Sequence, residues 1–214
     1  MKVYSGCPVC EAGSLDAFQR VRGTQYHRCT VCEATVMDPD HWLTEPQERE
    51  IYDLHDNHPD DPGYRRFLSK VTGPLLQRLA QGARGLDFGC GPGPALARIM
   101  EEAGMGMCLY DPFFYPDTTV LEQPYDFVTC TEVVEHLHNP AAVFRQLDAL
   151  VKPGGWLAVM TCFQTDDHQF ANWHYRRDPT HVVFYREATL ARIAKIRGWT
   201  LEVPAKDVAL FRKP

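Results

Sequence analysis

Apolar positions between residues 64 and 214 follow a helical period in some stretches and a strand-like pattern in others. The first helical stretch contains Phe67, Leu68, Val71, Leu75, Leu76 and Leu79. After it we expect strands over 85–88, 105–110, 125–130 and 156–161, and helices over 95–103, 141–151 and 186–197. Strands alternating with helices of about ten residues predict βαβ units and a parallel sheet. Two last strands, over 199–203 and 207–211, are joined by a short turn containing Pro204 and are expected to pair antiparallel.

The first 63 residues show a different pattern. Short strands are expected over 15–21 and 25–29, in a segment too small to fold without a staple such as a metal ion. The following residues are rich in Asp, Glu, His and Pro, and Thr44 and Gln47 form a candidate capping box for one short helix near 48–54. We therefore predict three parts: a ribbon over 1–36, a connector over 37–63, and an α/β core over 64–214.

The composition is that of a globular protein. The chain has 214 residues, of which 44% are apolar and 23% charged, and these values exclude a disordered or fibrous chain. No run approaches the roughly 18 apolar residues that cross a bilayer, and the N-terminus lacks the apolar segment of a secretory signal. We therefore expect a cytoplasmic protein that does not enter the membrane. The net charge of −6 argues against broad nucleic-acid binding.

Four of the eight cysteines form two Cys-x-x-Cys pairs. Eighteen residues separate Cys7 and Cys10 from Cys29 and Cys32, a spacing typical of zinc sites. Each pair lets one tight turn point two sulfurs at one ion, and two turns complete a closed tetrahedral shell. Such a shell has no open position, so we predict a structural Zn²⁺ rather than a catalytic one. Two disulfides are the alternative, which a reducing cytoplasm disfavours; His27 could replace one thiolate.

The other four cysteines, Cys90, Cys108, Cys130 and Cys162, are scattered singly through apolar stretches. We expect them to behave as small buried apolar residues. Two of them are also expected to border a pocket, because Cys90 lies in a glycine loop and Cys130 at the end of a strand.

The glycine loop lies between the first strand of the core and the next helix. Gly89, Gly91 and Gly93 alternate there, two residues after Asp87. Glycines let the backbone approach a ligand and leave the helix N–H groups pointing at it. The spacing departs from the dinucleotide pattern G-x-G-x-x-G, which makes an NAD-dependent enzyme the weaker of two nucleotide interpretations. In either interpretation, Asp111 at the end of the second strand can accept hydrogen bonds from two ribose hydroxyls.

Three segments resemble class I S-adenosylmethionine-dependent methyltransferases, in the family's order and at its spacing. They are Asp87-Phe-Gly-Cys-Gly-Pro-Gly93, Tyr125-Asp-Phe-Val-Thr-Cys-Thr-Glu-Val-Val-Glu-His-Leu137 and Leu150-Val-Lys-Pro-Gly-Gly-Trp-Leu157. The resemblance covers about residues 64–214. It implies a doubly wound, seven-stranded, mostly parallel sheet whose last strand is antiparallel. A looser similarity links the ribbon and core to some sugar and ribosomal-RNA methyltransferases, and the core alone to quinone-biosynthesis methylases.

The resemblance also implies a cofactor site for S-adenosylmethionine. Gly89, Gly91 and Gly93 would line its methionine part beside Cys90, and Asp87 would help to hold its ammonium group. Asp111 would bind the ribose, with Pro112 and Phe113 against the adenine, and Cys130 and Thr131 would border the amino-acid moiety. The family's third strand normally ends in an acid near the adenine amine. Residues 115–122 are weakly patterned, so no residue is assigned to that contact.

The segment Asn172-Trp-His-Tyr-Arg-Arg-Asp-Pro-Thr-His181 is the best candidate for the acceptor side, and its last four residues resemble a substrate-side motif of these methyltransferases. His181 could act as a general base, since its reference pKa of about 6.5 suits proton abstraction near neutrality, and Asp178 could orient it. The alternative is that both residues only brace the loop. Candidate substrate residues are Trp173, His174, Tyr175, Arg176, Arg177 and, from the second motif, His136.

Four further candidate site residues lie just before the core, at His55, Asn57, His58 and Tyr64. They could close over the cofactor or belong to a solvated linker.

The sequence leaves four candidate functions open. The leading one is a methyltransferase for a small-molecule acceptor, with the ribbon as a lid, recognition or homodimer element. A methyltransferase acting on RNA or protein is the second. It is disfavoured for RNA because Lys2, Arg20, Arg22 and Arg28 against Glu11, Asp16 and Glu33 leave the ribbon only 4 − 3 = +1 in charge. A non-catalytic cofactor- or zinc-binding protein and an NAD-dependent enzyme complete the set.

Overall fold

A six-stranded sheet forms the centre of the protein in a computed structural model that describes residues 6–54 and 58–214. Its strands lie in the order β5-β4-β6-β7-β10-β9. Their bounds are β4 Arg84–Phe88, β5 Gly106–Tyr110, β6 Tyr125–Thr131, β7 Val151–Met160, β9 Thr200–Ala205 and β10 Val208–Arg212. The first four strands are parallel, and β10 runs antiparallel to both β7 and β9. The predicted α/β architecture and the antiparallel end of the sheet are confirmed.

The strand count differs from the seven that the family resemblance implies. Residues 115–122 contain a 3₁₀ helix, η2 (Thr118–Leu121), in place of a third parallel strand, so β5 forms the edge. The local sequence explains the difference, because Pro116 lacks a backbone donor and the Asp117 side chain accepts from the N–H of Thr119 at 2.9 Å. The final turn also differs, since Pro204 lies within β9 and the chain reverses after it, at Asp207, whose φ is 70°.

Helices cover both faces of this sheet because each has an apolar stripe. On one face, α2 (Pro62–Leu76) and α3 (Ala95–Glu102) pack Leu68, Val71 and Met100 into one cluster. On the other face, α4 (Pro140–Leu150) and α5 (Glu187–Arg197) contribute to a second cluster. Among the described residues, no helix is both long and apolar enough to cross a membrane.

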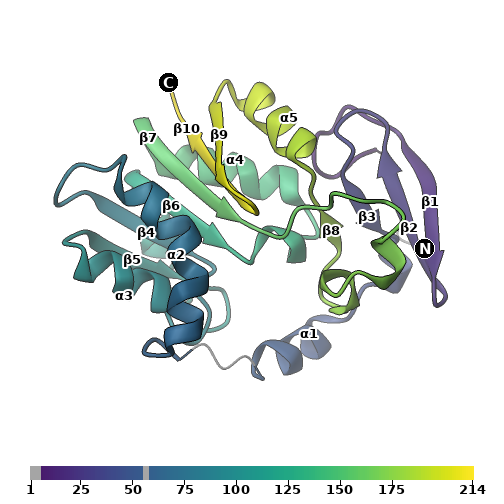
Figure 1. The fold of residues 1–214 in the computed structure, drawn as a ribbon, viewed down its shortest axis with the longest axis horizontal. Helices are drawn as coiled ribbons and strands as arrows, with labels where there is room; N and C mark the ends of the chain where they lie inside the picture. The colour runs from purple at the N-terminus through teal and green to yellow at the C-terminus, as the bar shows by residue number, and fades with distance from the viewer. Residues whose placement is uncertain (1–5, 55–57) are drawn as a thin grey trace.

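A smaller sheet joins the N-terminal segment to the core. It pairs β1 (Leu15–Val21), β2 (Thr24–Cys29) and β3 (Thr35–Met37) with β8 (Val183–Phe184) from far along the chain. Figure 1 shows this sheet at one end of the molecule and β5 at the other. The boundary predicted at residue 36 falls inside β3, because that strand pairs with β8 at Thr35–Phe184 and Val36–Val183.

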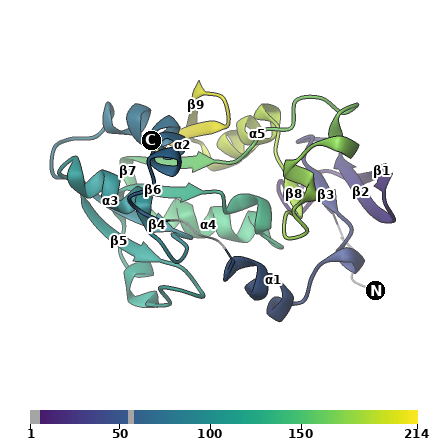
Figure 2. The same cartoon turned by 60° about the horizontal axis from the view of Figure 1, so that its bottom comes forward.

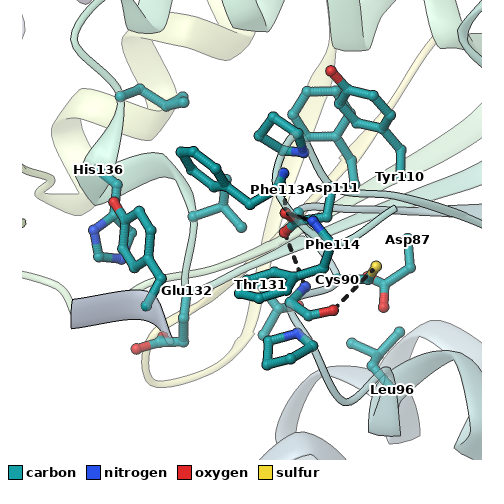
Figure 3. Close-up of a pocket in the computed structure, with 18 of the residues that line it drawn as sticks. Asp87, Cys90, Leu96, Tyr110, Asp111, Phe113, Phe114, Thr131, Glu132 and His136 are labelled. Atoms are coloured by element: carbon teal, nitrogen blue, oxygen red, sulfur yellow. Dashed lines mark hydrogen bonds between the residues drawn. The ribbon is translucent and has the colours of Figure 1, made fainter. Parts of the chain in front are cut away.

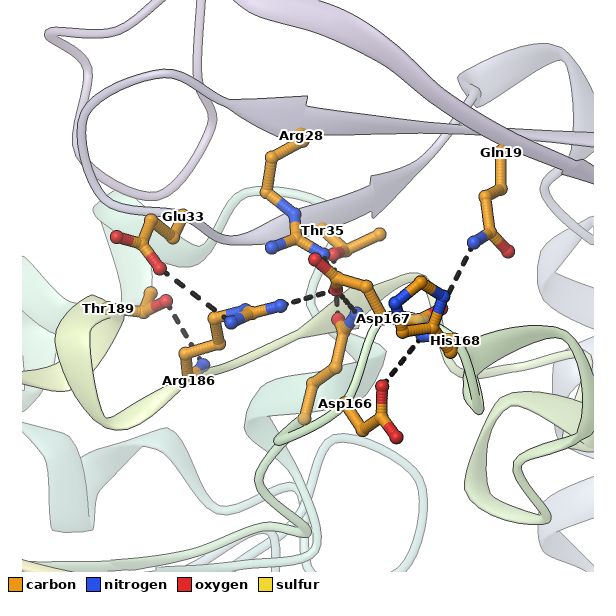
Figure 4. Close-up of polar contacts among 10 residues, drawn as sticks. Gln19, Arg28, Glu33, Thr35, Asp166, Asp167, His168, Arg186 and Thr189 are labelled. Carbon is orange, nitrogen blue, oxygen red and sulfur yellow. Dashed lines mark hydrogen bonds and ion pairs between the residues drawn. The ribbon is translucent and has the colours of Figure 1, made fainter.

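Polar contacts, most of them half-buried, fix the small sheet against the core (Figure 4). The Asp167 carboxylate accepts from Arg28 of β2 at 2.6 Å and from Arg186, just before α5. The hydroxyl of Thr189 donates to the carbonyl of Cys32 at 2.8 Å. The N-terminal segment is therefore docked on the core through β8 and α5.

The described part of the connector contains a 3₁₀ helix, η1 (Pro39–His41), and then the helix α1 (Glu45–Tyr52). The predicted capping box is present at Thr44 and Gln47, and the helix starts earlier than expected because Pro46 is tolerated in its first turn. Figure 1 and Figure 2 both show α1 at the lower edge, between the two sheets. Predicted residues His55 and Asn57 lie outside the described residues.

Candidate active site

The glycine loop has a backbone that only glycine adopts easily. Gly89 and Gly91 have φ of 79° and 65°, in the left-handed region. A Cβ on Gly89 would lie 2.4 Å from Cγ2 of Val133, so a side chain there would also clash. The N–H of Gly91 donates to Oδ2 of Asp111 at 3.0 Å, which ties the loop after β4 to the end of β5.

A cavity of about 660 Å³ opens beside this loop, at the carboxyl ends of β4, β5 and β6. Its volume lies in the usual range for small-ligand sites. The predicted residues that line it are Asp87, Gly89, Cys90, Gly91, Asp111, Pro112, Phe113, Thr131, His136, Asp178 and His181. Figure 3 shows Glu132 and His136 on one side of this site and Asp87 and Cys90 on the other. The cavity therefore has two ends with different chemistry.

Asp87 gives one end a buried carboxylate. Its side chain is 3% exposed and accepts from the hydroxyl of Thr129 at 2.7 Å. Burial raises the pKa of Asp87 to about 6, with a further contribution from the nearby charge of Asp111. Within the described chain no Lys, Arg or His forms an ion pair with Asp87. A buried carboxylate of this kind suits the ammonium group of a ligand.

Asp111 is held by the backbone. Its Oδ1 accepts from the N–H groups of Phe113 and Phe114 at 2.9 and 3.1 Å. These bonds fix the carboxylate at the end of β5 and use both lone pairs of Oδ1, whereas Oδ2, which accepts only from the N–H of Gly91, keeps one lone pair for a ligand hydroxyl.

The opposite end of the cavity contains two histidines whose rings lie 4.7 Å apart between centroids, His136 and His181. Nδ1 of His181 lies 2.7 Å from the carbonyl oxygen of Tyr175, whereas its Nε2 lies 3.8 Å from Asp178 Oδ2. A backbone carbonyl therefore orients the ring of His181. Asp178 instead braces its own loop by accepting from the N–H and hydroxyl of Thr180, and these bonds lower its pKa although burial opposes them.

A carboxylate pair behind the histidines was not predicted as part of the site. Glu132 lines the cavity with φ of 53°, and Glu135 is fully buried. The hydroxyl of Tyr175 donates to Glu135 and, at 3.3 Å, to Glu132. Burial raises the pKa of Glu132 to about 9, and the charge of Glu135 adds to the shift. Their place directly after a buried parallel strand could have indicated them.

The helix α1 completes the cavity wall through Glu48 and Tyr52, which were also not predicted. The ring of Tyr52 contacts Phe113 and His136, with centroids 5.7 and 5.4 Å apart. Tyr64, predicted from the connector, lines the cavity as well. His58 is exposed and does not line the cavity.

Several predicted residues lie outside the cavity lining. They are Gly93, Cys130, Trp173, His174, Tyr175, Arg176 and Arg177. Arg176 is buried and donates to the carbonyls of Phe170 and Ala171, so it braces the chain there. His174 and Arg177 are exposed at the surface. Trp173 packs on Phe170 among other aromatic rings.

The four N-terminal cysteines converge on one point. Their sulfurs all lie within 4.8 Å of one another and are buried. The Sγ–Sγ distances are 3.6 Å for Cys7–Cys32 and for Cys10–Cys29. These distances are far beyond a disulfide bond of about 2.05 Å and close to the edge of about 3.8 Å in a tetrahedral zinc–thiolate shell. The side chain of His27 instead pairs with Asp38 at 3.1 Å.

Backbone donors also favour thiolates in this cluster. The N–H of Val9 lies 3.4 Å from Cys7 Sγ, and those of Val31 and Cys32 lie 3.4 Å from Cys29 Sγ. A Cβ on Gly13 would lie 2.4 Å from Cys29 Sγ. The donor set and its backbone support therefore fit one tetrahedral ion.

Comparison with known proteins decides the family. A family model described as a methyltransferase domain matches residues 61–202, more than half of the chain. The chain belongs to this methyltransferase family. The matched range runs from α2 into the first half of β9, so the methyltransferase core contains the glycine loop, Asp111 and both histidines. The resemblance to class I methyltransferases inferred from the three motifs is confirmed.

Curated relatives match part of the methyltransferase core. A ubiquinone biosynthesis O-methyltransferase of Bordetella avium is 32% identical over 128 residues, covering 49% of this chain and 51% of the relative. The protein of the same name from Serratia proteamaculans is 36% identical over 92 residues, covering 42% and 38%. The chain thus spans about half the length of the first of these relatives, and less of the second.

Solved structures show the same fold. A Burkholderia thailandensis 1,6-didemethyltoxoflavin-N1-methyltransferase, solved with 1,6-didemethyltoxoflavin and S-adenosylhomocysteine, has a TM-score of 0.53 at 18% identity, covering 85% of this chain and 96% of that one. A protein of Pyrococcus horikoshii has a TM-score of 0.54 at 14% identity, covering 77% and 98%.

Proposed function

We propose that the protein transfers a methyl group from S-adenosylmethionine to a small-molecule acceptor. The observation that carries this proposal is the cavity, which joins the glycine loop, a buried Asp87 and a backbone-held Asp111 to a second end with two histidines. The family supports the proposal, and the names of the curated relatives agree with it.

The cofactor end fits S-adenosylmethionine residue by residue. Asp87 would hold the ammonium group, and Oδ2 of Asp111 would accept from the ribose. Phe113 lies beside Asp111 and would pack on the adenine, and the buried hydroxyl of Thr131, which lacks a hydrogen-bond partner among the described residues, would border the amino-acid part. When bound, the cofactor supplies a methyl group on a sulfonium, whose departure leaves a neutral thioether.

The acceptor end would be formed by His181, His136 and the ring of Tyr52, which lies against His136. Because the leaving group is good, the chain mainly has to align the acceptor and assist loss of its proton. Nδ1 of His181 donates to a carbonyl, so a neutral ring presents an unprotonated Nε2. This nitrogen can take a proton from the acceptor directly or bind a cation that acidifies it.

The acceptor is proposed to be a small molecule rather than RNA. Aromatic rings and α1 wall the cavity, whereas RNA binding calls for a basic footprint. The relatives from Bordetella and Serratia are named for a quinone pathway and the Burkholderia enzyme for methylating a small heterocycle, which agrees with an acceptor of that size.

Thermal unfolding with added cofactors tests the proposal. S-adenosylhomocysteine at about 100 times its dissociation constant should add about 2.7 kcal/mol to the free energy of unfolding and raise Tm by about 5–10 °C. NAD should not stabilise the protein. Asp111→Ala should weaken S-adenosylhomocysteine binding about 10- to 100-fold by removing charged hydrogen bonds, whereas exposed Asp117→Ala should not. Absence of stabilisation by the sulfur ligands would rule the proposal out.

Cofactor affinity should depend on pH through Asp87. The raised pKa of about 6 means that Asp87 is protonated in the ligand-free protein below that value and cannot attract an ammonium group. S-adenosylhomocysteine carries this ammonium without a sulfonium, so its affinity should fall about fivefold between pH 6 and pH 5. Calorimetric titrations at both pH values measure the change. A fall of the same size in Asp87→Asn would assign the pH dependence to another group.

We also propose that Cys7, Cys10, Cys29 and Cys32 bind one structural Zn²⁺. The convergence of four buried sulfurs with backbone N–H donors supports this assignment. All eight cysteines are unpaired in the structure, which agrees with a reducing compartment such as the cytoplasm.

A further inference from the structure

A second group of metal-binding side chains lies at the acceptor end of the cavity. One ligand atom each from Glu135, His136 and His181 falls within 4.8 Å of the other two. The first two residues belong to η3 (Val134–His136), just after β6, and the third precedes β8. Folding therefore brings together ligands that are 45 residues apart in the chain.

Both histidines are oriented to present Nε2. Nδ1 of His136 lies 3.2 Å from the carbonyl of Thr180, and Nδ1 of His181 lies 2.7 Å from the carbonyl of Tyr175. A carbonyl oxygen only accepts, so each Nδ1 carries the hydrogen and each neutral Nε2 keeps its lone pair. Metal-binding histidines are held in this way, through their other nitrogen.

The carboxylate of Glu135 is buried, and only one of its two oxygens has a hydrogen-bond partner among the described residues. Glu135 is 0% exposed, and Tyr175 donates to its Oε1, but its Oε2 has no hydrogen-bond partner among the described residues. Glu132 and Asp178 lie near the same end, and no Lys or Arg of the described chain forms an ion pair with any of the three carboxylates. A buried, unpaired carboxylate oxygen is costly unless a cation or donor meets it.

We propose that Glu135 and the Nε2 atoms of His136 and His181 bind one divalent transition-metal ion at the acceptor end. Two imidazoles and one carboxylate form the donor set of catalytic zinc sites and of three-ligand sites that keep open positions. His136 and His181 both line the cavity, so the open positions face the acceptor. This centre differs from the cysteine cluster, whose four thiolates close their shell.

The bound ion indicates which chemical class of acceptor the site would take. This part of the inference rests on the proposed methyl transfer. A hydroxyl oxygen bound at an open position loses its proton to water near neutral pH. The oxygen then forms a bond to the methyl carbon, the carbon–sulfur bond breaks, and its electron pair stays on sulfur. The acceptor is therefore a small molecule with a hydroxyl group.

Titration of the zinc-containing protein with Mn²⁺, followed by electron paramagnetic resonance, tests the site. Mn²⁺ prefers oxygen and nitrogen ligands and does not displace zinc from thiolates. We expect one Mn²⁺ per chain and enhanced relaxation of water protons, because open positions carry exchanging water. His181→Ala and Glu135→Gln should each weaken Mn²⁺ binding at least about 100-fold, since even outer-shell changes cost 10- to 100-fold. Exposed His168→Ala, a matched control, should bind Mn²⁺ as the wild type does.

Parallel titrations with S-adenosylhomocysteine separate this inference from the proposed function. Retained S-adenosylhomocysteine binding in His181→Ala shows that the variant is folded, so its lost Mn²⁺ binding reports the site. Wild type that binds S-adenosylhomocysteine but no Mn²⁺ overturns the metal site alone. Wild type that binds Mn²⁺ but neither sulfur ligand supports the metal site and overturns the proposed function.

Discussion

Cys10→Ser is expected to release the metal from the cysteine cluster and to unfold the small sheet while the glycine loop stays folded. Zinc binding is worth about 10–16 kcal/mol in zinc-finger peptides, as much as the whole stability of a typical domain. The small sheet pairs β3 with β8, and β8 begins two residues after His181. Loss of the ion should therefore also disorder the acceptor end of the cavity.

Metal analysis and backbone hydrogen exchange measure this effect. The variant should lose one zinc per chain and show reduced protection in β1–β3 and β8, with protection retained in β4. Cys108→Ser changes a half-buried cysteine outside the cluster and should keep the zinc. A Cys10→Ser protein with full zinc content and unchanged protection would contradict the assignment of this cluster.

Asp87→Asn is expected to abolish most cofactor affinity and yet to stabilise the ligand-free protein. Folding raises the pKa of the Asp87 carboxyl, so the folded protein is most stable when this carboxyl is protonated. The free energy of unfolding therefore falls as the pH rises from about 4 to about 6. For Asp87, with a pKa of about 6 against 3.8 unperturbed, the penalty at pH 7 is about 3 kcal/mol. Asparagine carries no charge and escapes this penalty.

Urea unfolding of the ligand-free proteins measures the gain. It should reach up to about 3 kcal/mol at pH 7 and shrink to roughly half of that at pH 5. Asp126→Asn provides a contrast, because bonds from the Arg84 N–H and the Lys152 ammonium lower the pKa of Asp126 and its loss should destabilise the protein. Equal or lower stability of Asp87→Asn at pH 7 would show that the buried carboxylate carries no cost.

The fold was predictable where the hydrophobic pattern was long and regular. The stripe through Leu68, Val71 and Leu75 predicted α2, and alternating strands and helices predicted the parallel sheet. The missing third strand was the main departure, since the family resemblance implied it while the local sequence, with Pro116 and Asp117, does not form one. Pairing of β3 with β8 could not be predicted, because both strands are too short to carry a pattern.

The lining of the cavity was predictable at the end that contains the glycine loop and only partly at the end that contains the two histidines. Asp87 lies near the end of β4, and the glycines and Asp111 directly follow strands, where local sequence and topology place a ligand. Arg176 was expected to meet the substrate but donates to backbone carbonyls, because the loop that carries it packs on the small sheet, where Arg176 also donates to the hydroxyl of Tyr26. The role of Glu135 could not be predicted from its motif, because only folding brings its carboxylate together with His136 and His181.

The sequence alone determined the class of fold, the cysteine cluster and the glycine loop, because each depends on residues close together in the chain. Glycine is the residue that most easily adopts left-handed backbone, and two Cys-x-x-Cys turns complete a metal site once they come together. The tertiary structure decided which groups face one another across the cavity. His181 meets His136 and Glu135 because β8 pairs with β3 and the chain before it folds over the end of β6, and contacts of that range depend on the packing of the whole protein.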